Sequence, residues 1–400
     1  MSSVRRTRVL SVTDSLDVGG AERVAVDIAN SLDRRTHEVL ICATRHGGPL
    51  QATLRDDVDV TILDRRATWD PTGPARFARL VRRERIDVVH SHARGTMKFV
   101  ALCRRTGLID TPHVFHDHYG RLHLDRRAPS DLRSAMRLGV DEYLGVDSRL
   151  CAWARHSIGL APDRVHLARS GVDLSRFEGV VPVDLRDACD LPGREVVLVM
   201  VANLRQQKDH PTVLRAVAAL PEDLRRRLAV VFVGSTTAEP AFTAHCRAMI
   251  DDLGIEDQVR TVGEQSDPLR WIAGADGAVL ASKNETGPLV VLEYMGCGVP
   301  FVATDTGEIT RSVRDLDIGF LPAPRDHREV ADALAALIEL GPSGRRAMGE
   351  RGARAAAERF GQAGVTRRIE AVYRDVLDRR RHGAAAPAGR APGARSVAGH

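Results

Sequence analysis

The sequence predicts an α/β protein with two open, parallel-sheet domains that face a central cleft. Three observations lead to this fold class. The chain has 400 residues, whereas a single hydrophobic core stops growing near ~250–300 residues. Short runs rich in Val, Ile and Leu alternate with amphipathic stretches, which is typical of parallel strands covered by helices on both faces. A Gly- and Pro-interrupted stretch at residues 170–193 breaks this alternation once, and the alternation then resumes.

In the first half, apolar runs predict strands that are separated by helical stretches. Residues 21–32 illustrate the helical pattern, because Val24, Ile28 and Leu32 recur every four positions. We therefore expect an N-terminal domain over residues 1–170. The expected strands are Arg8–Thr13, Glu38–Ala43, Val58–Leu63, Ile86–His90, His113–His116, Glu142–Val146 and Arg164–Ala168.

The second half repeats the pattern after a predicted linker at 171–194. It predicts a C-terminal domain over residues 195–360 and a final helix over 361–380. The tail at 381–400 is rich in Ala, Gly, Pro and Arg, a composition typical of disorder. The expected strands are Glu195–Ala202, Ala229–Gly234, Gln258–Gly263, Gly277–Ala281, Val299–Thr304 and Ile318–Leu321.

The overall composition is that of a globular protein, with 43% hydrophobic and 28% charged residues. No apolar run approaches the ~20 residues that cross a bilayer. The first residues lead directly into a strand pattern and not into a signal-peptide core, so we expect a cytoplasmic location. The six cysteines are scattered through apolar contexts, which predicts buried thiols, neither disulfides nor a zinc site.

The basic residues do not indicate a nucleic-acid partner. The net charge is only +5, and of 58 basic residues only Lys98, Lys208 and Lys283 are lysine. We interpret this as the arginine bias of a GC-rich genome. With four Tyr and three Trp, the chain also lacks the basic and aromatic interleaving that binds single strands.

Two glutamates eight residues apart, Glu285 and Glu293, carry the strongest functional signal. A short strand precedes them, and Gly287 and Pro288 form a turn into a helix. A helix start presents unpaired N–H groups and a positive dipole end, which suits an anion such as a diphosphate. Carboxylates beside it can accept hydrogen bonds from sugar hydroxyls. The pattern favours a nucleotide-sugar site, although a structural salt bridge could also satisfy a buried Glu293.

Two further segments follow the first strand of each predicted domain. Arg205 and Lys208 lie three residues apart, which places both cations on one side of a turn or helix, where they can bind a diphosphate. A solvated basic loop is the alternative. Gly19 and Gly20 let a ligand approach the backbone, although two glycines before a helix more often form a plain turn. This is not the G-x-G-x-x-G fingerprint, and no acidic residue ends the second strand, so NAD binding is not expected.

Histidines end the fourth and fifth strands of the first domain. His90 and His92 end one strand, and His116 and His118 end the next. Alternation places His116 and His118 on the same face. They can serve as general bases, as sugar contacts or as a hydrogen-bonded structural pair. No third and fourth ligand follows at convincing spacing, so no metal is expected.

Taken together, these segments resemble the retaining glycosyltransferases of family 4, which have the GT-B fold of two Rossmann-like domains. The resemblance runs in order from about residue 7 to 375. The matching segments are the Gly-Gly-Ala-Glu loop, Val89–His92, Ser170–Asp173 with Phe177, the Arg205/Lys208 segment, the Glu285/Glu293 pair and Leu292–Pro300. The chain has Arg169-Ser170 where the family often shows Pro-Asn.

The resemblance implies a role for each candidate residue. Arg205 and Lys208 would neutralise the donor diphosphate, and no metal would then be needed. Glu293 would hold the ribose, and Gly19 and Gly20 would line the acceptor side. Glu285 would hold the transferred sugar together with the backbone of Gly287, Pro288, Leu289 and Val290. Either His116 or His118 would meet the sugar near its reacting carbon. The final helix would cross back to the first domain, and the two domains would close around the donor.

The implied partners are a nucleotide-diphosphate sugar and an unknown hydroxyl acceptor, which could be a polysaccharide, a lipid-linked molecule or a secondary metabolite. Residues 120–139 are rich in arginine: Arg121, Arg126, Arg127, Arg133 and Arg137. This predicts a solvated helix, with peripheral contact to the inner face of the membrane as the alternative. Two other functions stay open, a nucleotide-sugar epimerase of the same architecture and a non-catalytic nucleotide-sugar binding protein.

Overall fold

The computed structural model describes residues 5–66, 70–120 and 128–385 and contains two parallel sheets. The first sheet has the strand order β3-β2-β1-β4-β5-β6-β7. Its strands begin close to the predicted positions, because buried parallel strands read as continuous apolar runs. They are β1 Thr7–Thr13, β2 His37–Ala43, β3 Asp59–Ile62, β4 Val88–His92, β5 His113–Asp117, β6 Glu142–Gly145 and β7 Val165–Leu167.

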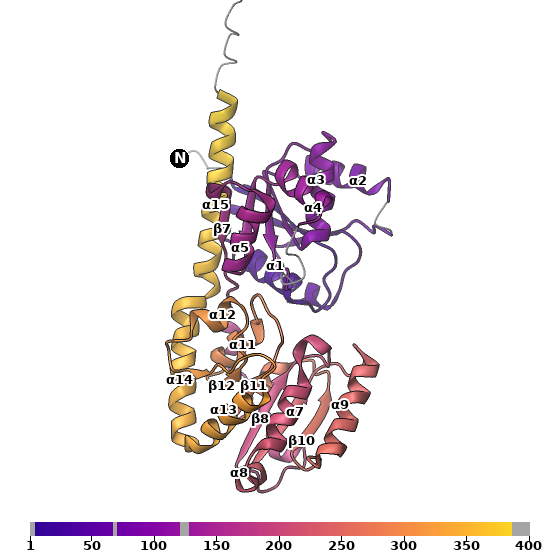
Figure 1. Ribbon diagram of the computed structural model, residues 1–400. Helices are drawn as coiled ribbons and strands as arrows, with labels where there is room; N and C mark the ends of the chain where they lie inside the picture. The colour runs from indigo at the N-terminus through magenta and orange to yellow at the C-terminus, as the bar shows by residue number, and fades with distance from the viewer. Residues whose placement is uncertain (1–4, 67–69, 121–127, 386–400) are drawn as a thin grey trace, which may run out of the picture.

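The second sheet has the order β10-β9-β8-β11-β12-β13 and lies in the C-terminal half. Figure 1 shows the two sheets in separate lobes, one above the other. The predicted α/β fold with two parallel-sheet domains is confirmed. The strands are β8 Val196–Val201, β9 Leu228–Val233, β10 Val259–Gly263, β11 Gly277–Leu280, β12 Phe301–Ala303 and β13 Gly319–Phe320.

Helices connect successive strands and cover both sheets. The helix predicted at 21–32 is α1, Gly20–Ser31. The others in the first half are α2 Gly73–Arg83, α3 Arg94–Arg105, α4 Ser130–Gly139 and α5 Ser148–Trp153. Those of the second half are α6 Leu185–Ala188, α7 His210–Ala219, α8 Glu222–Arg227, α9 Pro240–Leu253, α10 Pro268–Ala273, α11 Leu289–Gly296, α12 Gly307–Ser312, α13 His327–Glu339, α14 Gly341–Phe360 and α15 Gln362–Ala385.

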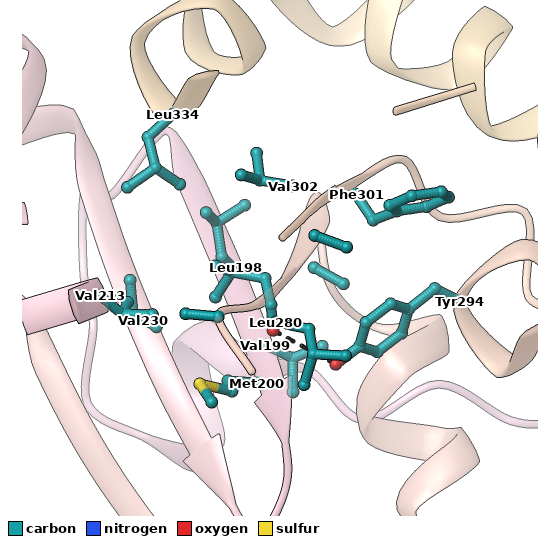
Figure 2. Packing of buried hydrophobic residues seen from close by; sticks show 14 of the residues in the cluster. Leu198, Val199, Met200, Val213, Val230, Leu280, Tyr294, Phe301, Val302 and Leu334 are labelled. Carbon is teal, nitrogen blue, oxygen red and sulfur yellow. Dashed lines mark hydrogen bonds between the residues drawn. The ribbon is translucent and has the colours of Figure 1, made fainter. Parts of the chain in front are cut away.

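The second sheet belongs to a large cluster of buried apolar residues. Figure 2 shows Leu198 of β8 and Val302 of β12 below Leu334 of α13. On α11, the fully buried Tyr294 donates its hydroxyl to the Val279 carbonyl at 3.3 Å and accepts from the Val201 amide at 3.2 Å. These two bonds attach α11 to β8 and β11, which fixes the position of the turn that precedes this helix.

The final helix returns to the first domain. α15 packs Ile369 and Tyr373 into the same buried cluster as Val9 and Val88 of the first sheet, and Figure 1 shows it alongside that lobe in yellow. It extends to Ala385, so the predicted disorder at 381–385 is replaced by helix. The predicted tail at 386–400 lies outside the described residues.

The chain passes between the domains twice, and the two passages are joined. The Val172 amide donates to the Phe360 carbonyl at 2.8 Å, and the Gln362 amide donates to the Val172 carbonyl at 2.9 Å. The linker is therefore held against the start of α15, next to the boundary between the lobes.

The described part of the chain contains no helix that combines the length and the apolar character needed to cross a bilayer. Arg133 and Arg137 lie on α4, whereas Arg121, Arg126 and Arg127 lie outside the described residues. Membrane contact by this segment stays a prediction. All six cysteines are free, and five of them are buried, as expected for structural thiols.

Candidate active site between the two sheets

Each sheet has a point where the strand order reverses, and ligands of open α/β sheets bind at such points beyond the carboxyl ends of the strands. In the first sheet β1 lies between β2 and β4, and in the second β8 lies between β9 and β11. A cleft of about 490 Å³ is lined from both lobes at these strand ends. Its lining includes Gly20, Ala21, Val24, Ala93, Arg94, Asp117, His118, Tyr119, Gly120, Val146, Ser170, Gln207, Glu285, Thr286, Gly287 and Leu289.

The turns after β8 and β11 form one unit on the C-terminal side of the cleft. The Lys283 amide donates to the Gln207 carbonyl at 2.9 Å, and Gln207 Nε2 donates to the Asn284 carbonyl at 3.0 Å. These bonds hold the turn that carries Lys208 against the turn that carries Glu285. Residues that are 77 positions apart in the chain thus share one site.

Lys208 Nζ lies 2.6 Å from Glu285 Oε1. Both side chains are partly shielded from solvent, with exposed fractions of 26% and 11%. The predicted cation and one of the predicted carboxylates are therefore brought together and neutralise each other; Glu285 lines the cleft, and Lys208 does not.

Arg205 is exposed and precedes the 3₁₀ turn Gln206–Lys208. Within the described residues its guanidinium forms no ion pair, and it does not line the cleft. Its role at the diphosphate stays a prediction.

Glu293 has a protein partner. Arg176 Nη2 of the linker lies 3.3 Å from Glu293 Oε1. Burial raises the pKa of Glu293 above its usual value, while Arg176 and Arg23 act in the opposite direction. The structural salt bridge that was the alternative reading is present, and Glu293 does not line the cleft. The ribose contact stays a prediction.

The start of α11 faces the cleft without a side-chain cap. Pro288 occupies the N-cap position and supplies no side-chain hydrogen bond. Gly287 and Leu289 line the cleft, whereas Val290 does not. The first amides of a helix have no intrahelical partner, and anion binding at this end stays a prediction.

The glycine turn lies on the opposite wall. Gly20 begins α1 and lines the cleft, and a Cβ atom built there meets nothing within 4 Å. A Cβ at Gly19 would instead collide with the Glu22 carboxylate. Gly20 is therefore the glycine that keeps the cleft open.

The structure separates the two histidines that the sequence left equivalent. His118 lines the cleft, and its Nε2 lies 3.2 Å from His92 Nδ1. His116 is completely buried, with Nε2 3.4 Å from the Ala168 carbonyl. His116 does not line the cleft, so His118 is the better placed of the two histidines to contact a sugar there.

Several residues of this site were missed in the sequence. Arg94 of α3 lies 3.7 Å from the centre of the Tyr119 ring and 3.2 Å from Asp117 Oδ2, and both partners line the cleft. Thr286 Oγ1 donates to the His118 carbonyl at 3.4 Å and links the two lobes across the cleft. The sequence did contain a signal for Arg94 and Asp117, because Arg94 follows β4 and Asp117 ends the neighbouring β5, so both could be expected at the same edge of the sheet.

A second link between the lobes explains the unusual Arg169. Its Nη2 lies 2.8 Å from Glu308 Oε1 on α12, and Glu308 Oε2 also accepts from the Ser148 amide at 3.0 Å. These partners lower the pKa of Glu308 although its burial acts to raise it. Arg169, which stands where the family often has proline, thus forms an ion pair between the lobes.

Comparisons with known proteins agree with this geometry. Residues 18–176 match the family model described as Glycosyltransferase Family 4, and residues 184–355 match the model Glycosyl transferases group 1. The chain is 32% identical over 317 residues to a D-inositol 3-phosphate glycosyltransferase of Streptosporangium roseum, covering 74% of this chain and 71% of the relative. An N-acetyl-alpha-D-glucosaminyl L-malate synthase of Bacillus anthracis is 23% identical, with 92% and 97% covered.

Solved structures show the same two-lobed fold. A glycosyltransferase of Rickettsia africae superposes with a TM-score of 0.79 at 18% identity, covering 94% of this chain and 99% of that one. The Anabaena protein HepE in complex with UDP-glucose has a TM-score of 0.76 at 20% identity, with 92% and 100% covered. At these identities the likeness establishes the fold, and the expected GT-B architecture is confirmed.

Proposed function

The chain belongs to glycosyltransferase family 4, and we propose that it transfers a sugar from a uridine diphosphate sugar to an acceptor hydroxyl with retention of anomeric configuration. The observation that carries this proposal is the cleft at the reversal points of both sheets. One wall offers the Glu285 carboxylate, which is paired with Lys208 behind it, and an uncapped helix start, and the other offers a glycine turn and a histidine. The complexes of HepE with UDP and UDP-glucose support uridine as the donor base.

The donor diphosphate lies against the start of α11, with Lys208 beside it. An anion there gains the unpaired amides and the positive helix end, and it draws Lys208 away from Glu285. The released Glu285 carboxylate then accepts hydrogen bonds from hydroxyls of the transferred sugar. In this way binding of the donor exchanges an internal ion pair for two contacts to the substrate.

Transfer proceeds on one face of the sugar. The bond from the anomeric carbon to the diphosphate breaks as an oxocarbenium-like sugar forms. The acceptor oxygen then bonds to the anomeric carbon on the same face, and the leaving phosphate oxygen takes the proton of the acceptor hydroxyl. The work of the protein is to stabilise charge on the leaving group and to orient both substrates. Lys208 and Arg205 supply positive charge, so this mechanism needs no metal at the diphosphate. His118 meets the sugar from the first lobe.

The acceptor enters along the wall that Gly20 keeps open. The relatives are named for inositol 3-phosphate and for malate, both small hydroxylated anions. This favours a small hydroxylated anion over a polysaccharide or a lipid-linked acceptor, and D-inositol 3-phosphate and L-malate are the first acceptors to test.

Thermal unfolding with nucleotides tests donor binding. A ligand that binds only the folded state stabilises it by RT ln(1 + [L]/Kd), so millimolar UDP should raise the Tm more than GDP or ADP does. If none of the three changes the Tm, the proposal fails. If GDP or ADP gives the largest shift, the assignment of the donor base is wrong.

Turnover of UDP-glucose and UDP-N-acetylglucosamine, with and without acceptors, tests the reaction. A transferase releases UDP faster when its acceptor is present, and nuclear magnetic resonance of the product reports the anomeric configuration. An epimerase would convert the donor without an acceptor. A binding protein would release no UDP under any condition.

A further inference from the structure

Three buried histidines meet behind the cleft, at the carboxyl ends of β4 and β5. His90, His92 and His116 have exposed fractions of 0%, 1% and 0%. The centres of the His90 and His92 rings are 4.3 Å apart, and the His116 ring lies 5.5 Å from each. One ring nitrogen of each histidine lies within 4.8 Å of one ring nitrogen of each of the others.

The strand register produces this cluster. His92 of β4 pairs with His116 of β5, and His90 lies two residues before His92, so all three side chains leave the same face of the sheet. Because the strands are neighbours in space and distant in sequence, the third ligand could not be found from spacing along the chain.

Each of the three histidines has one ring nitrogen without a partner in the structure. These atoms are His90 Nε2, His92 Nε2 and His116 Nδ1. A buried polar atom left unsatisfied costs about 1–3 kcal/mol, and native structures contain few of them. Three such atoms in one cluster indicate that something occupies the space between them.

The other ring nitrogen of each histidine is held by a neighbour. His116 Nε2 meets the Ala168 carbonyl, which can only accept, so Nε2 carries the proton and Nδ1 has a free lone pair. His90 Nδ1 lies 2.6 Å from the Tyr373 hydroxyl, and His92 Nδ1 lies 3.2 Å from His118 Nε2. Metal-binding histidines are held in this way, with one nitrogen on the ion and the other donating to an outer partner.

We propose that His90, His92 and His116 bind one divalent transition-metal ion of the zinc type. Three imidazoles are a common ligand set for zinc, with a water at the fourth position. Ser11 and Thr13 of β1 also bury unpartnered hydroxyls, and Ser11 pairs with His90 in the sheet. Such hydroxyls suit a hydrogen bond with that water.

The chemistry of the cluster agrees with this assignment. A metal binds the neutral imidazole through a ring nitrogen that carries no proton, and each of the three histidines has a ring nitrogen without a partner. The ion would also fix His118, because a metal-bound His92 would donate its Nδ1–H to His118 Nε2.

This site is distinct from any metal on the donor diphosphate, and its occupancy does not depend on the transfer reaction. The test uses the full chain, freed of metal by a chelator, dialysed and titrated with Co²⁺ alone. Binding of one Co²⁺ per chain should produce the intense visible absorption of a four-coordinate nitrogen site, and Zn²⁺ should abolish it. Elemental analysis of the protein reloaded with Zn²⁺ gives the stoichiometry independently.

Variants identify the ligands. His92→Ala and His116→Ala should each lose the cobalt spectrum and the bound zinc. His210→Ala is the matched control, because His210 of α7 is buried with both ring nitrogens unpartnered but lies in the second domain; it should bind as the wild type does. Tyr373→Phe removes an outer partner and should weaken Zn²⁺ affinity about 10–100-fold.

Two results would overturn the proposal. Wild-type protein that takes up far less than one equivalent of either ion would show that the cluster is filled by water alone. Cluster variants that retain the wild-type spectrum and stoichiometry would place the ion elsewhere. Circular dichroism shows which variants are folded, and the wild-type measurement decides the matter even if a cluster variant fails to fold.

Discussion

Lys208 Nζ and Glu285 Oε1 are 2.6 Å apart, across the turns that follow β8 and β11. Neither side chain is free in the protein without substrate. Under the proposed function, a donor that binds here would separate them, because its diphosphate offers Lys208 two negative charges in place of one. In the protein without substrate, the pair leaves neither charge uncompensated.

Lys208→Ala should lower turnover at least ~100-fold, the scale of losing one transition-state contact. The physical reason is the loss of positive charge beside the leaving diphosphate. Release of UDP at saturating donor measures the effect. Lys98→Ala is the matched control, since Lys98 pairs with Asp131 on the surface of the first domain and should leave turnover unchanged. Equal rates for both variants would remove Lys208 from this role.

Glu285→Ala should also lower turnover at least ~100-fold, because the sugar loses its carboxylate acceptor. UDP should still raise the Tm of this variant, since the diphosphate contacts remain and Lys208 is released from its partner. Glu195→Ala removes a solvent-exposed partner of Arg227 and serves as the control. A Glu285→Ala protein with full turnover would show that this carboxylate does not hold the sugar.

Substitutions at Gly20 should separate activity from stability. Gly20→Ala adds a methyl group where the structure has open space, so its free energy of unfolding should stay within about 1 kcal/mol of wild type. Gly20→Phe should fold equally well but raise the acceptor KM or abolish transfer, because the ring projects into the cleft. Thermal unfolding and acceptor kinetics check the two effects. A fully active Gly20→Phe variant would place the acceptor elsewhere.

Asp27→Asn should stabilise the protein at neutral and alkaline pH. Burial raises the pKa of Asp27 from 3.8 to about 6, against the attraction of Arg23 and Arg176. Between these two values the folded state holds a proton that the unfolded state has lost, so wild-type stability falls as the pH rises through this window. The gain of the variant should be on the order of 1–3 kcal/mol above about pH 7 and should vanish below about pH 4.

Urea unfolding of both proteins across this pH range measures the difference. A wild-type protein that is more stable than Asp27→Asn at alkaline pH would mean that the two arginines outweigh the burial of the carboxylate.

Much of the architecture was predictable from the sequence, because each buried parallel strand is specified by a short run of neighbouring residues. Runs such as Val196–Val201 are apolar throughout, and amphipathic segments such as α1 repeat every three or four residues. The glycine turn and the helix start after Pro288 were also predictable, since both depend on neighbouring residues. The predicted helix ended five residues before the end of α15 at Ala385. Ala and Arg, which suggested a disordered tail, also have high helix propensity.

Within the candidate site, the sequence predicted which residue types matter but not how they are paired. It indicated Lys208 and Glu285, yet their contact depends on β8 and β11 being neighbours in the sheet. It could not choose between His116 and His118, because exposure depends on what packs over the strand end. Nor could it show that Glu293 already has Arg176 as a partner.

The sequence by itself determined two parallel-sheet domains, the turns at their strand ends and the charges carried there, because each is specified by residues close together in the chain. Only the tertiary structure decided which charges pair, which histidine reaches the cleft and which three histidines meet behind it. Those contacts arise from strand order and from α15 packing back onto the first lobe. The residues involved lie far apart in the chain, so patterns among neighbouring residues cannot predict these contacts.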